Sequence, residues 1–465
     1  MTSTLDGVAW LPWGAPAFAR ARREGKPILL SITAPWSIGC REMDRVSYGD
    51  PSVAAAIAAR VVAVRVDADH RPDIADRYDF GGLPTTAFLS ADGQVLGGGT
   101  FVPPERLREA LERVGGVRLG SDPGQTRVRP ESDPGLTPPY LDDATLTTLV
   151  FDTFDEAHAG FGGTPKFPHT APVRLALDLY AESGDPVMLE RAVRTLDAMG
   201  WGGLYDETGG GFFRCAAQAD WSGAHGEKLL PDNAALLDLY VHAGTVAGHE
   251  RWFARAVDVV HFIERKLIAA NGAWRLTECA EPGRQFTDSN AVTASAMLHA
   301  ARIFDDEALG TRALDALERV LLSSYRPGQG VAHSAAGVRG LLTDHVTMAA
   351  ANLDAWESTG NIVYRMMAEE LMHVAIRTMG DEAAGGFFDR AIVDEDGDCG
   401  LLSVRVKPFV LNCDAAVVLR RLAEAADDPD FARQAAAALE AVGGRAASQG
   451  PLAAHYVIAR RAVPR

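Results

Sequence analysis

Short hydrophobic runs alternate with amphipathic segments over the first 115 residues of the chain. The runs 27–33, 61–67 and 86–90 have the apolar character of buried strands, and helical patterns lie between the first two. The sequence Asp92-Gly93 predicts a hairpin turn after the third run, and a helix that starts with proline follows. This order of elements predicts an α/β domain.

After residue 139 the pattern changes to helices with almost no interruption. Apolar residues recur at spacings of three and four, for example at Ala192, Leu196 and Met199, as on the buried face of a helix. Twelve helices and no comparable strand run predict six helical hairpins. The predicted helices are 141–158, 171–183, 186–200, 230–248, 250–269, 288–304, 307–325, 342–359, 361–379, 412–426, 428–443 and 450–461.

Three of the loops between these helices carry glycines next to an aromatic residue, at 160–163, 209–213 and 385–389. The last two recur about half a domain apart, which predicts a closed or stacked array of helix pairs. An (α/α)6 toroid accounts for both the helix count and the recurring loops. An open α-solenoid is the alternative.

The segment 116–139 is rich in glycine, proline and serine and has little apolar content, which is typical of a linker. We therefore predict an α/β domain at 1–115, a linker at 116–139 and a helical toroid at 140–465.

Charge and cysteine content narrow the possible partners. The net charge is −17 with no basic cluster, which argues against nucleic acid or an anionic membrane as a partner. The five cysteines are an odd number without metal-ligand spacing, so reduced thiols are expected. We see neither a signal peptide nor an apolar run that could span a bilayer, and we expect a cytoplasmic protein with no metal and no cofactor.

The first domain resembles thioredoxin-like proteins. Trp36-Ser37-x-x-Cys40 stands in the place of Trp-Cys-x-x-Cys, and Pro84 stands where that fold keeps a cis-proline beside the active sulfur. The first thiol of such a pair is the nucleophile at a helix N-terminus, so Ser37 excludes dithiol exchange at this motif. Serine is also a good helix N-cap. Cys40 is then either a small buried residue or a monothiol group.

The whole chain resembles a family that joins a thioredoxin-like domain to a six-hairpin domain like that of N-acylglucosamine 2-epimerase, a group that includes a spermatogenesis-associated protein. The markers include Gly162-Gly-Thr-Pro-Lys-Phe-Pro168, Gly202-Gly-Leu-Tyr-Asp206, and His225-Gly-Glu-Lys228 followed by Asp232-Asn233. The family usually has Cys-x-x-Cys where this chain has Ser37 and Cys40. The resemblance implies the fold, while the activity of the family is poorly defined.

Polar residues gather at the predicted helix entrances of the toroid. His225 and Glu227 offer an imidazole and a carboxylate in one loop, and with Asp232 they are the predicted catalytic residues. Aromatic, carboxylate and amide groups suit a sugar-like ligand. The predicted ligand-binding residues are Lys166, Tyr205, Asp206, Arg214, Lys228, Asn233, Asp288, Asn290, Asp344 and His345. The structural alternative is that these residues are N-caps and ion pairs.

Three functions remain open from the sequence. The first is an enzyme that acts on a carbohydrate or a similar polar molecule, as an isomerase, epimerase or hydrolase, through general acid–base chemistry. The second is a monothiol redox or thiol-sensing protein that uses Cys40. The third is a non-catalytic binding or scaffold protein. Most other histidines, His242 and His299 among them, are assigned to the surface or the core.

Overall fold

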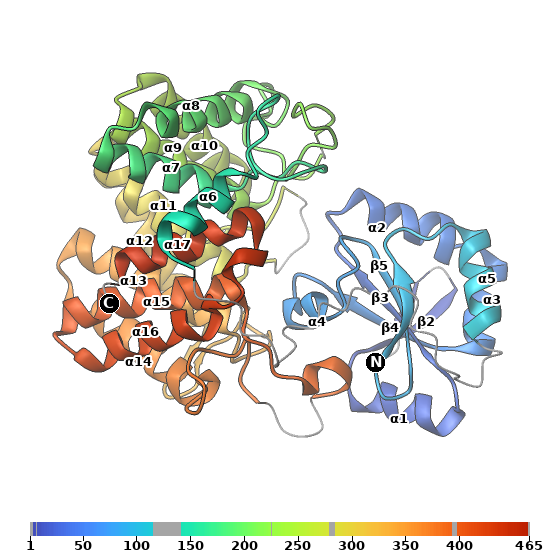
Figure 1. Ribbon diagram of the computed structural model, residues 1–465. Coiled ribbons are helices and arrows are strands. Elements are labelled where there is room, and N and C mark those ends of the chain that lie inside the picture. The colour runs from blue at the N-terminus through green and yellow to red at the C-terminus, as the bar shows by residue number, and fades with distance from the viewer. Residues whose placement is uncertain are drawn as a thin grey trace. The chain divides into compact units, whose positions relative to one another are not determined.

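The computed structural model describes residues 3–5, 7–114, 141–224, 226–278, 284–392 and 398–463 (Figure 1). The chain forms two compact units. One comprises Met1–Gly135 with Ile392–Val406, and the other comprises Leu136–Ala391 with Lys407–Arg465. The whole of the predicted linker, 116–139, and the predicted catalytic residue His225 lie outside the described residues.

The first unit is built on a six-stranded sheet with strand order β1-β2-β4-β3-β5-β6. Central strand β3 pairs in parallel with β4 and antiparallel with β5. The three predicted strand runs are confirmed as β3, β4 and β5. The strands are β1 (Ser3–Leu5), β2 (Val8–Pro12), β3 (Ile28–Thr33), β4 (Val62–Asp67), β5 (Thr85–Leu89) and β6 (Val95–Gly99).

Helices cover both faces of this sheet, because alternate side chains of β3 and β4 point to opposite sides. Leu30 and Val64 pack with helices α1 and α4, whereas Leu29 and Ala63 pack with α3 and α5. A short π-helical segment, Asp44–Tyr48, follows α2. The helices are α1 (Ala15–Glu24), α2 (Ile38–Met43), α3 (Pro51–Arg60), α4 (Pro72–Arg77) and α5 (Pro104–Val114).

The segment Ile392–Val406 belongs to this first unit, although sequence reasoning assigned it to the toroid at 140–465. Its 3-10 helix, Gly400–Ser403, places Leu402 in the core beside α1 and α4. The Leu401 N–H donates to the Tyr78 hydroxyl at 2.9 Å. The sequence boundary was wrong here because a segment this short carries no periodic pattern.

The second unit is a closed ring of helices. Six inner helices contact one another in order, and α17 closes the ring against α7. This closure confirms the toroid and excludes the open solenoid. The inner helices are α7 (Thr170–Ser183), α9 (Leu230–Ala247), α11 (Thr287–Phe304), α13 (Leu342–Thr359), α15 (Phe409–Ala426) and α17 (Ala453–Ala462).

Each outer helix packs on the inner helix of its own or the adjacent hairpin. The outer helices are α6 (Asp143–Phe151), α8 (Pro186–Trp201), α10 (Glu250–Phe262), α12 (Glu307–Ser324), α14 (Ile362–Met379) and α16 (Pro429–Gly443). Short elements complete the unit: a π-helical segment Ile263–Leu267, the pair β7 (Tyr325–Arg326) and β8 (Gly330–Val331), and 3-10 turns Ala446–Ser448 and Gly450–Leu452.

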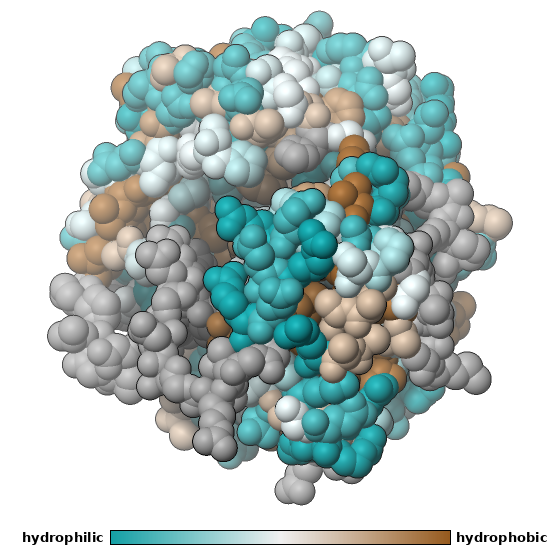
Figure 2. Space-filling model, turned by 90° about the vertical axis from the view of Figure 1, so that its right-hand side faces the viewer, coloured by the Kyte–Doolittle hydropathy of each residue, from teal (hydrophilic) through white to brown (hydrophobic). Residues whose placement is uncertain are grey.

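Helix α6 ends well before the predicted residue 158. The carboxylate of Asp155 accepts hydrogen bonds from the N–H groups of Ala157 and His158, which forms a turn instead of another helical turn. None of the helices in the described part of the chain is long and apolar enough to cross a membrane. On the face shown in Figure 2, hydrophobic residues lie in small groups among hydrophilic ones.

Candidate functional site

The Ser37–Cys40 segment forms the start of α2. The Ser37 hydroxyl accepts a hydrogen bond from the Cys40 N–H at 3.3 Å, which makes it the N-cap of the helix. The side chain of Cys40 is buried, and its sulfur accepts from the Ala34 N–H. The Trp36 indole donates to Asp69, and the Leu83–Pro84 bond is cis, as predicted. The segment therefore presents no exposed thiol.

Three asparagines, Asn233, Asn290 and Asn412, hold the loops that precede inner helices α9, α11 and α15. Each accepts from the N–H and donates to the carbonyl of one loop residue. For Asn233 that residue is Phe212, at 2.7 and 3.0 Å. Trp274 and Phe387 are the partners of the other two. These loop-anchoring asparagines are buried and bind backbone groups through their amides, so the structure gives Asn233 and Asn290, both predicted to bind a ligand, a structural role.

His345 takes the corresponding place in α13. Its Nδ1 lies 2.8 Å from the Leu341 carbonyl oxygen, the same turn-back contact that each asparagine makes. Burial lowers the pKa of this imidazole to about 4. The structure therefore places His345, which was predicted to bind a ligand, in the core as a neutral imidazole.

Three lysines form ion pairs with aspartates of the glycine-rich loops. Lys166 binds Asp155 at 2.5 Å, and Lys228 binds Asp206 at 2.7 Å and also the Gly210 carbonyl. Lys407 repeats the arrangement with Asp381. Lys166 and Lys228 are buried. The predicted binding residues Lys166, Asp206 and Lys228 are thus engaged in stabilising these loops.

Tyr205 is a further predicted binding residue that packs into the protein. Its ring lies 3.6 Å from the Arg255 guanidinium carbon and edge-on to Phe212. Only 7% of its surface is exposed. The aromatic stacking face expected for a sugar is therefore covered.

The helix entrances do bring some predicted residues together. The Arg214 N–H donates to the Glu227 carbonyl at 2.9 Å, and the Arg214 charge acts on Asp232. Burial raises the pKa of Asp232 to about 6, and Arg214 opposes that rise. Asp288 and Asp344 meet at the starts of α11 and α13, next to His333.

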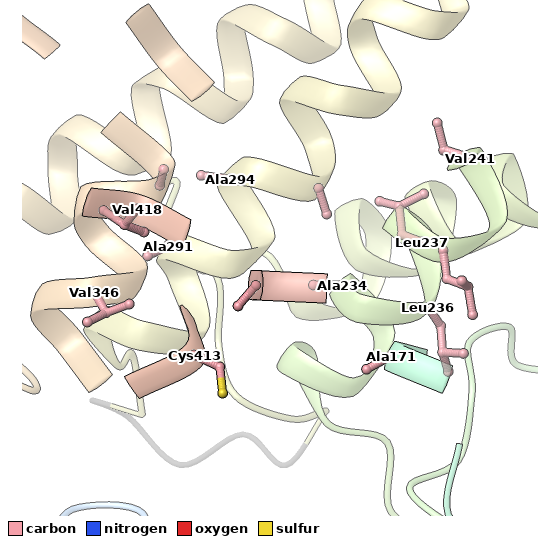
Figure 3. Close-up of a cluster of buried hydrophobic side chains, with 14 of the residues drawn as sticks. Ala171, Ala234, Leu236, Leu237, Val241, Ala291, Ala294, Val346, Cys413 and Val418 are labelled. Carbon is pink, nitrogen blue, oxygen red and sulfur yellow. The ribbon is translucent and has the colours of Figure 1, made fainter. Parts of the chain in front are cut away.

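The toroid encloses a cavity of about 830 Å³ that is lined by the six inner helices. Small and branched side chains leave this space open, among them Ala171, Ala234, Val346 and Val418 (Figure 3). None of the predicted catalytic or ligand-binding residues that the structure describes lines it. The sequence placed the site at the helix entrances, whereas the cavity lies along the helices themselves.

One polar residue from each of four neighbouring inner helices faces this cavity at an equivalent position. His242, His299, Asp354 and Arg421 all line it. They follow Asn233, Asn290, His345 and Asn412 respectively, at the same spacing along each helix. Because the inner helices run in the same direction around the ring, these four side chains form one polar belt.

Two imidazoles of the belt are oriented by aspartates from other helices. His242 Nε2 lies 2.8 Å from Asp178, and His299 Nδ1 lies 2.6 Å from Asp238. Arg174 also binds Asp238, at 2.8 Å. Burial alone would raise the pKa of Asp238, but the hydrogen bond from His299 and the Arg174 charge hold it below its ordinary value. Each imidazole therefore has one nitrogen fixed by a carboxylate and the other left for a ligand.

The opposite side of the cavity carries a second charged group. Arg421 binds Asp354 at 2.6 Å and Glu357 at 2.8 Å, and His455 lies 3.4 Å from Asp414. Planar guanidinium and carboxylate groups of this kind recognise hydroxyl-rich molecules through paired hydrogen bonds.

Sequence reasoning missed these cavity residues, because a lone histidine on a helix carries no local motif. Two signals were present in the sequence. Asp238 and His242 are four residues apart, and would share one face of a helix. His242 and His299 also have the same spacing from Asn233 and Asn290, which becomes visible only when the hairpins are aligned.

Comparisons with known proteins agree with both folds. Residues 2–115 match the family model Thioredox_DsbH, described as "Protein of unknown function, DUF255". The chain is similar to human spermatogenesis-associated protein 20, with 28% identity over 309 residues, which are 59% of this chain and 39% of the human protein. The match therefore spans only about two fifths of that relative.

Solved structures resemble the helical unit. The cellobiose 2-epimerase from Bacillus thermoamylovorans aligns with a TM-score of 0.55 and 12% identity, over 63% of this chain and 82% of that one. A D-mannose isomerase aligns with a TM-score of 0.54 and 12% identity, over 64% and 84%. At these identities the likeness shows the fold. The protein thus combines a thioredoxin-like domain with an (α/α)6 toroid.

Proposed function

We propose that the toroid binds a carbohydrate-like polar molecule in its central cavity and transfers protons on it, as a sugar isomerase or epimerase does. The observation that carries this proposal is the pair His242 and His299, two imidazoles anchored by aspartates and facing one cavity. The proteins of known structure that share the toroid fold include enzymes named for sugar epimerisation and isomerisation.

The chemistry needs two acid–base groups. A base removes the proton from the carbon beside the sugar carbonyl, and the electron pair of that C–H bond becomes the C=C bond of an enediol. A general acid donates a proton to the carbonyl oxygen at the same time. A proton then returns to one carbon of the C=C bond while an enediol hydroxyl loses its proton to a base and becomes the new carbonyl, so the isomerisation needs no redox partner. Histidine suits both roles, since its ordinary pKa lies near neutral pH.

The charged groups around the imidazoles would serve for binding. Arg174 and Arg421 already hold aspartates in the wall of the cavity, and their remaining N–H groups can donate to sugar hydroxyls. A cavity of about 830 Å³ has the size of typical small-molecule sites. A mono- or disaccharide fits this volume.

We propose no dithiol exchange for the thioredoxin-like domain. Ser37 has no thiol, and Cys40 is buried beneath the start of α2. The buried position of Cys40 also argues against the monothiol alternative.

The test is hydrogen exchange on the substrate. The protein is incubated with a panel of aldoses and ketoses in D2O, and loss of the C2 proton signal is followed by NMR. Exchange by the wild type is expected with at least one sugar, and His299→Asn or His242→Asn should slow it about 100-fold or more. The matched control is His261→Asn, which changes an exposed histidine on outer helix α10.

A further variant separates the cavity from the helix entrances. If Glu227→Gln abolishes exchange while both cavity histidine variants keep it, the reaction takes place at the entrances and our assignment is wrong. If no sugar exchanges and none raises the melting temperature, the proposed function itself fails.

A further inference from the structure

A second polar group lies at the entrances of inner helices α11 and α13, and it does not depend on the proposed function. Asp288 belongs to the first turn of α11, Asp344 to the first turn of α13, and His333 to the segment after β8. One potential ligand atom of each residue lies within 4.8 Å of the others. Residues that are far apart in the sequence thus converge on one point.

We propose that Asp288, His333 and Asp344 form a binding site for a divalent transition-metal ion such as Mn²⁺ or Zn²⁺. The three side chains supply one imidazole nitrogen and two carboxylates. Carboxylates favour Mn²⁺, imidazole favours Zn²⁺, and a mixed set binds both better than it binds Mg²⁺ or Ca²⁺. Three protein ligands leave coordination positions open for water or a ligand.

The distances between the ligand atoms fit this assignment. His333 Nδ1 lies 2.9 Å from Asp344 Oδ1. Two ligands at about 2.1 Å from a metal and at right angles to each other are about 3 Å apart, given usual metal–nitrogen and metal–oxygen distances. The ion would replace the proton now shared between these two atoms.

The second carboxylate oxygen of Asp344 is the independent sign of a missing partner. Asp344 is completely buried, and its Oδ2 has no hydrogen-bond partner in the described structure. A buried polar atom without a partner is costly, and native proteins rarely retain one without a reason.

The surroundings keep the other two groups in place. Asp288 Oδ1 accepts from the N–H and the hydroxyl of Ser289, which leaves its second oxygen for an ion. The His333 ring stacks on Phe286, with centroids 4.9 Å apart and planes at 25°. Both contacts restrict side-chain rotation, as outer contacts do in metal sites.

The sequence offers a close control. Asp232 occupies in α9 the position that Asp344 occupies in α13, one residue before Asn233 and His345 respectively. Its Oδ2 also lacks a partner, but it faces the charge of Arg214 instead of a histidine. Asp232→Asn therefore removes a carboxylate at the equivalent position without touching the proposed ligands.

The experiment measures metal affinity directly. Full-length protein is freed of metal with a chelator and titrated calorimetrically with MnCl2 and with ZnCl2, and Co²⁺ binding is followed by its visible absorption. We expect one equivalent of metal to bind, with Co²⁺ bands that indicate nitrogen and oxygen ligands. Asp344→Asn and His333→Gln should each weaken binding about 10- to 100-fold or more.

Each other outcome overturns the proposal. His333 and Asp344 would be only a proton-sharing pair if the wild type bound no metal. The same conclusion would follow if metal affinity were unchanged in Asp344→Asn and His333→Gln, or if Asp232→Asn weakened it equally. A thiolate charge-transfer band with Co²⁺ would place the metal on a cysteine. If Asp344→Asn does not fold, as judged by circular dichroism, the more exposed Asp288→Asn provides the same comparison.

Discussion

The loops at the helix entrances and the wall of the central cavity are both rich in polar residues, but they use them differently. In the loops, the Asn233 amide binds backbone groups and Lys166 pairs with the carboxylate of Asp155. In the cavity, His242 and His299 each bind an aspartate of a neighbouring helix through one ring nitrogen, and both residues line the open space. The first arrangement stabilises the fold, and the second is available for chemistry.

This difference explains why the conspicuous motifs drew attention to the loops and not to the cavity. Long loops contain many backbone groups without secondary-structure partners, and each buried group needs a hydrogen bond. Side chains that supply those bonds must sit at fixed places near glycines and prolines, so they form recognisable motifs. A residue that faces a cavity needs only the right place on a helix, which leaves no local signature.

The largest effect should come from breaking a loop anchor. Asn233→Ala leaves the N–H and carbonyl of Phe212 buried without partners, and should lower the free energy of unfolding by about 4 kcal/mol. Urea unfolding of the helical unit, followed by far-ultraviolet circular dichroism, measures the loss. Asn271→Ala, which removes an exposed amide pair with Gln285, is the control and should cost under about 0.5 kcal/mol. A loss of ligand binding without a loss of stability would mean that Asn233 belongs to the site after all.

The next largest effect is a pH dependence of the free energy of unfolding that comes from His345. Its pKa in the folded state is about 4, below the ordinary 6.5, so protonation favours unfolding. The stability that the neutral imidazole contributes is present above pH 6.5 and is lost as the pH falls through 4, by about 3 kcal/mol in total. In His345→Asn, which restores the side chain found in the other helices, this loss should disappear.

The measurement is the difference in unfolding free energy between wild type and His345→Asn from pH 7 to pH 4. Asp232 and Asp344, whose pKa values are raised to about 6, titrate in the same range with the opposite sign. They occur in both proteins, so their contribution cancels in the difference. Parallel stability curves would show that His345 is not buried in its neutral form.

The fold was accessible from the sequence because its signals are local and periodic. The spacing of Ala192, Leu196 and Met199 and the runs that became β3, β4 and β5 each specify one buried face. The cavity residues could not be predicted from the sequence, because their arrangement depends on which helices become neighbours. Only the packing of successive inner helices brings Asp238 of α9 to His299 of α11, and Asp178 of α7 to His242.

A smaller effect on stability is expected at Ser37, in the thioredoxin-like unit. Ser37→Cys should reduce stability by about 1 kcal/mol, because the cap of α2 is replaced by a weaker acceptor. Residues three apart in a first helical turn are close enough for a disulfide, so oxidation should join Cys40 to the new thiol. Insulin reduction with dithiothreitol should stay at background in the wild type and in Ser37→Ala, and rise only in Ser37→Cys. Strong wild-type turnover would contradict the structural role of this motif.

The smallest effect on stability should come from the cavity itself. His299 is partly exposed to the cavity, and its partner Asp238 keeps Arg174 when the imidazole is removed. His299→Asn should therefore change the free energy of unfolding by under about 1 kcal/mol. The same variant should abolish the rise in melting temperature that a bound sugar gives to the wild type, since a ligand stabilises only what it binds. If His299→Asn lowered the free energy of unfolding by several kcal/mol, His299 would have a structural role like that of the loop-anchoring asparagines. The distinction between the cavity wall and the loops at the helix entrances would then no longer hold.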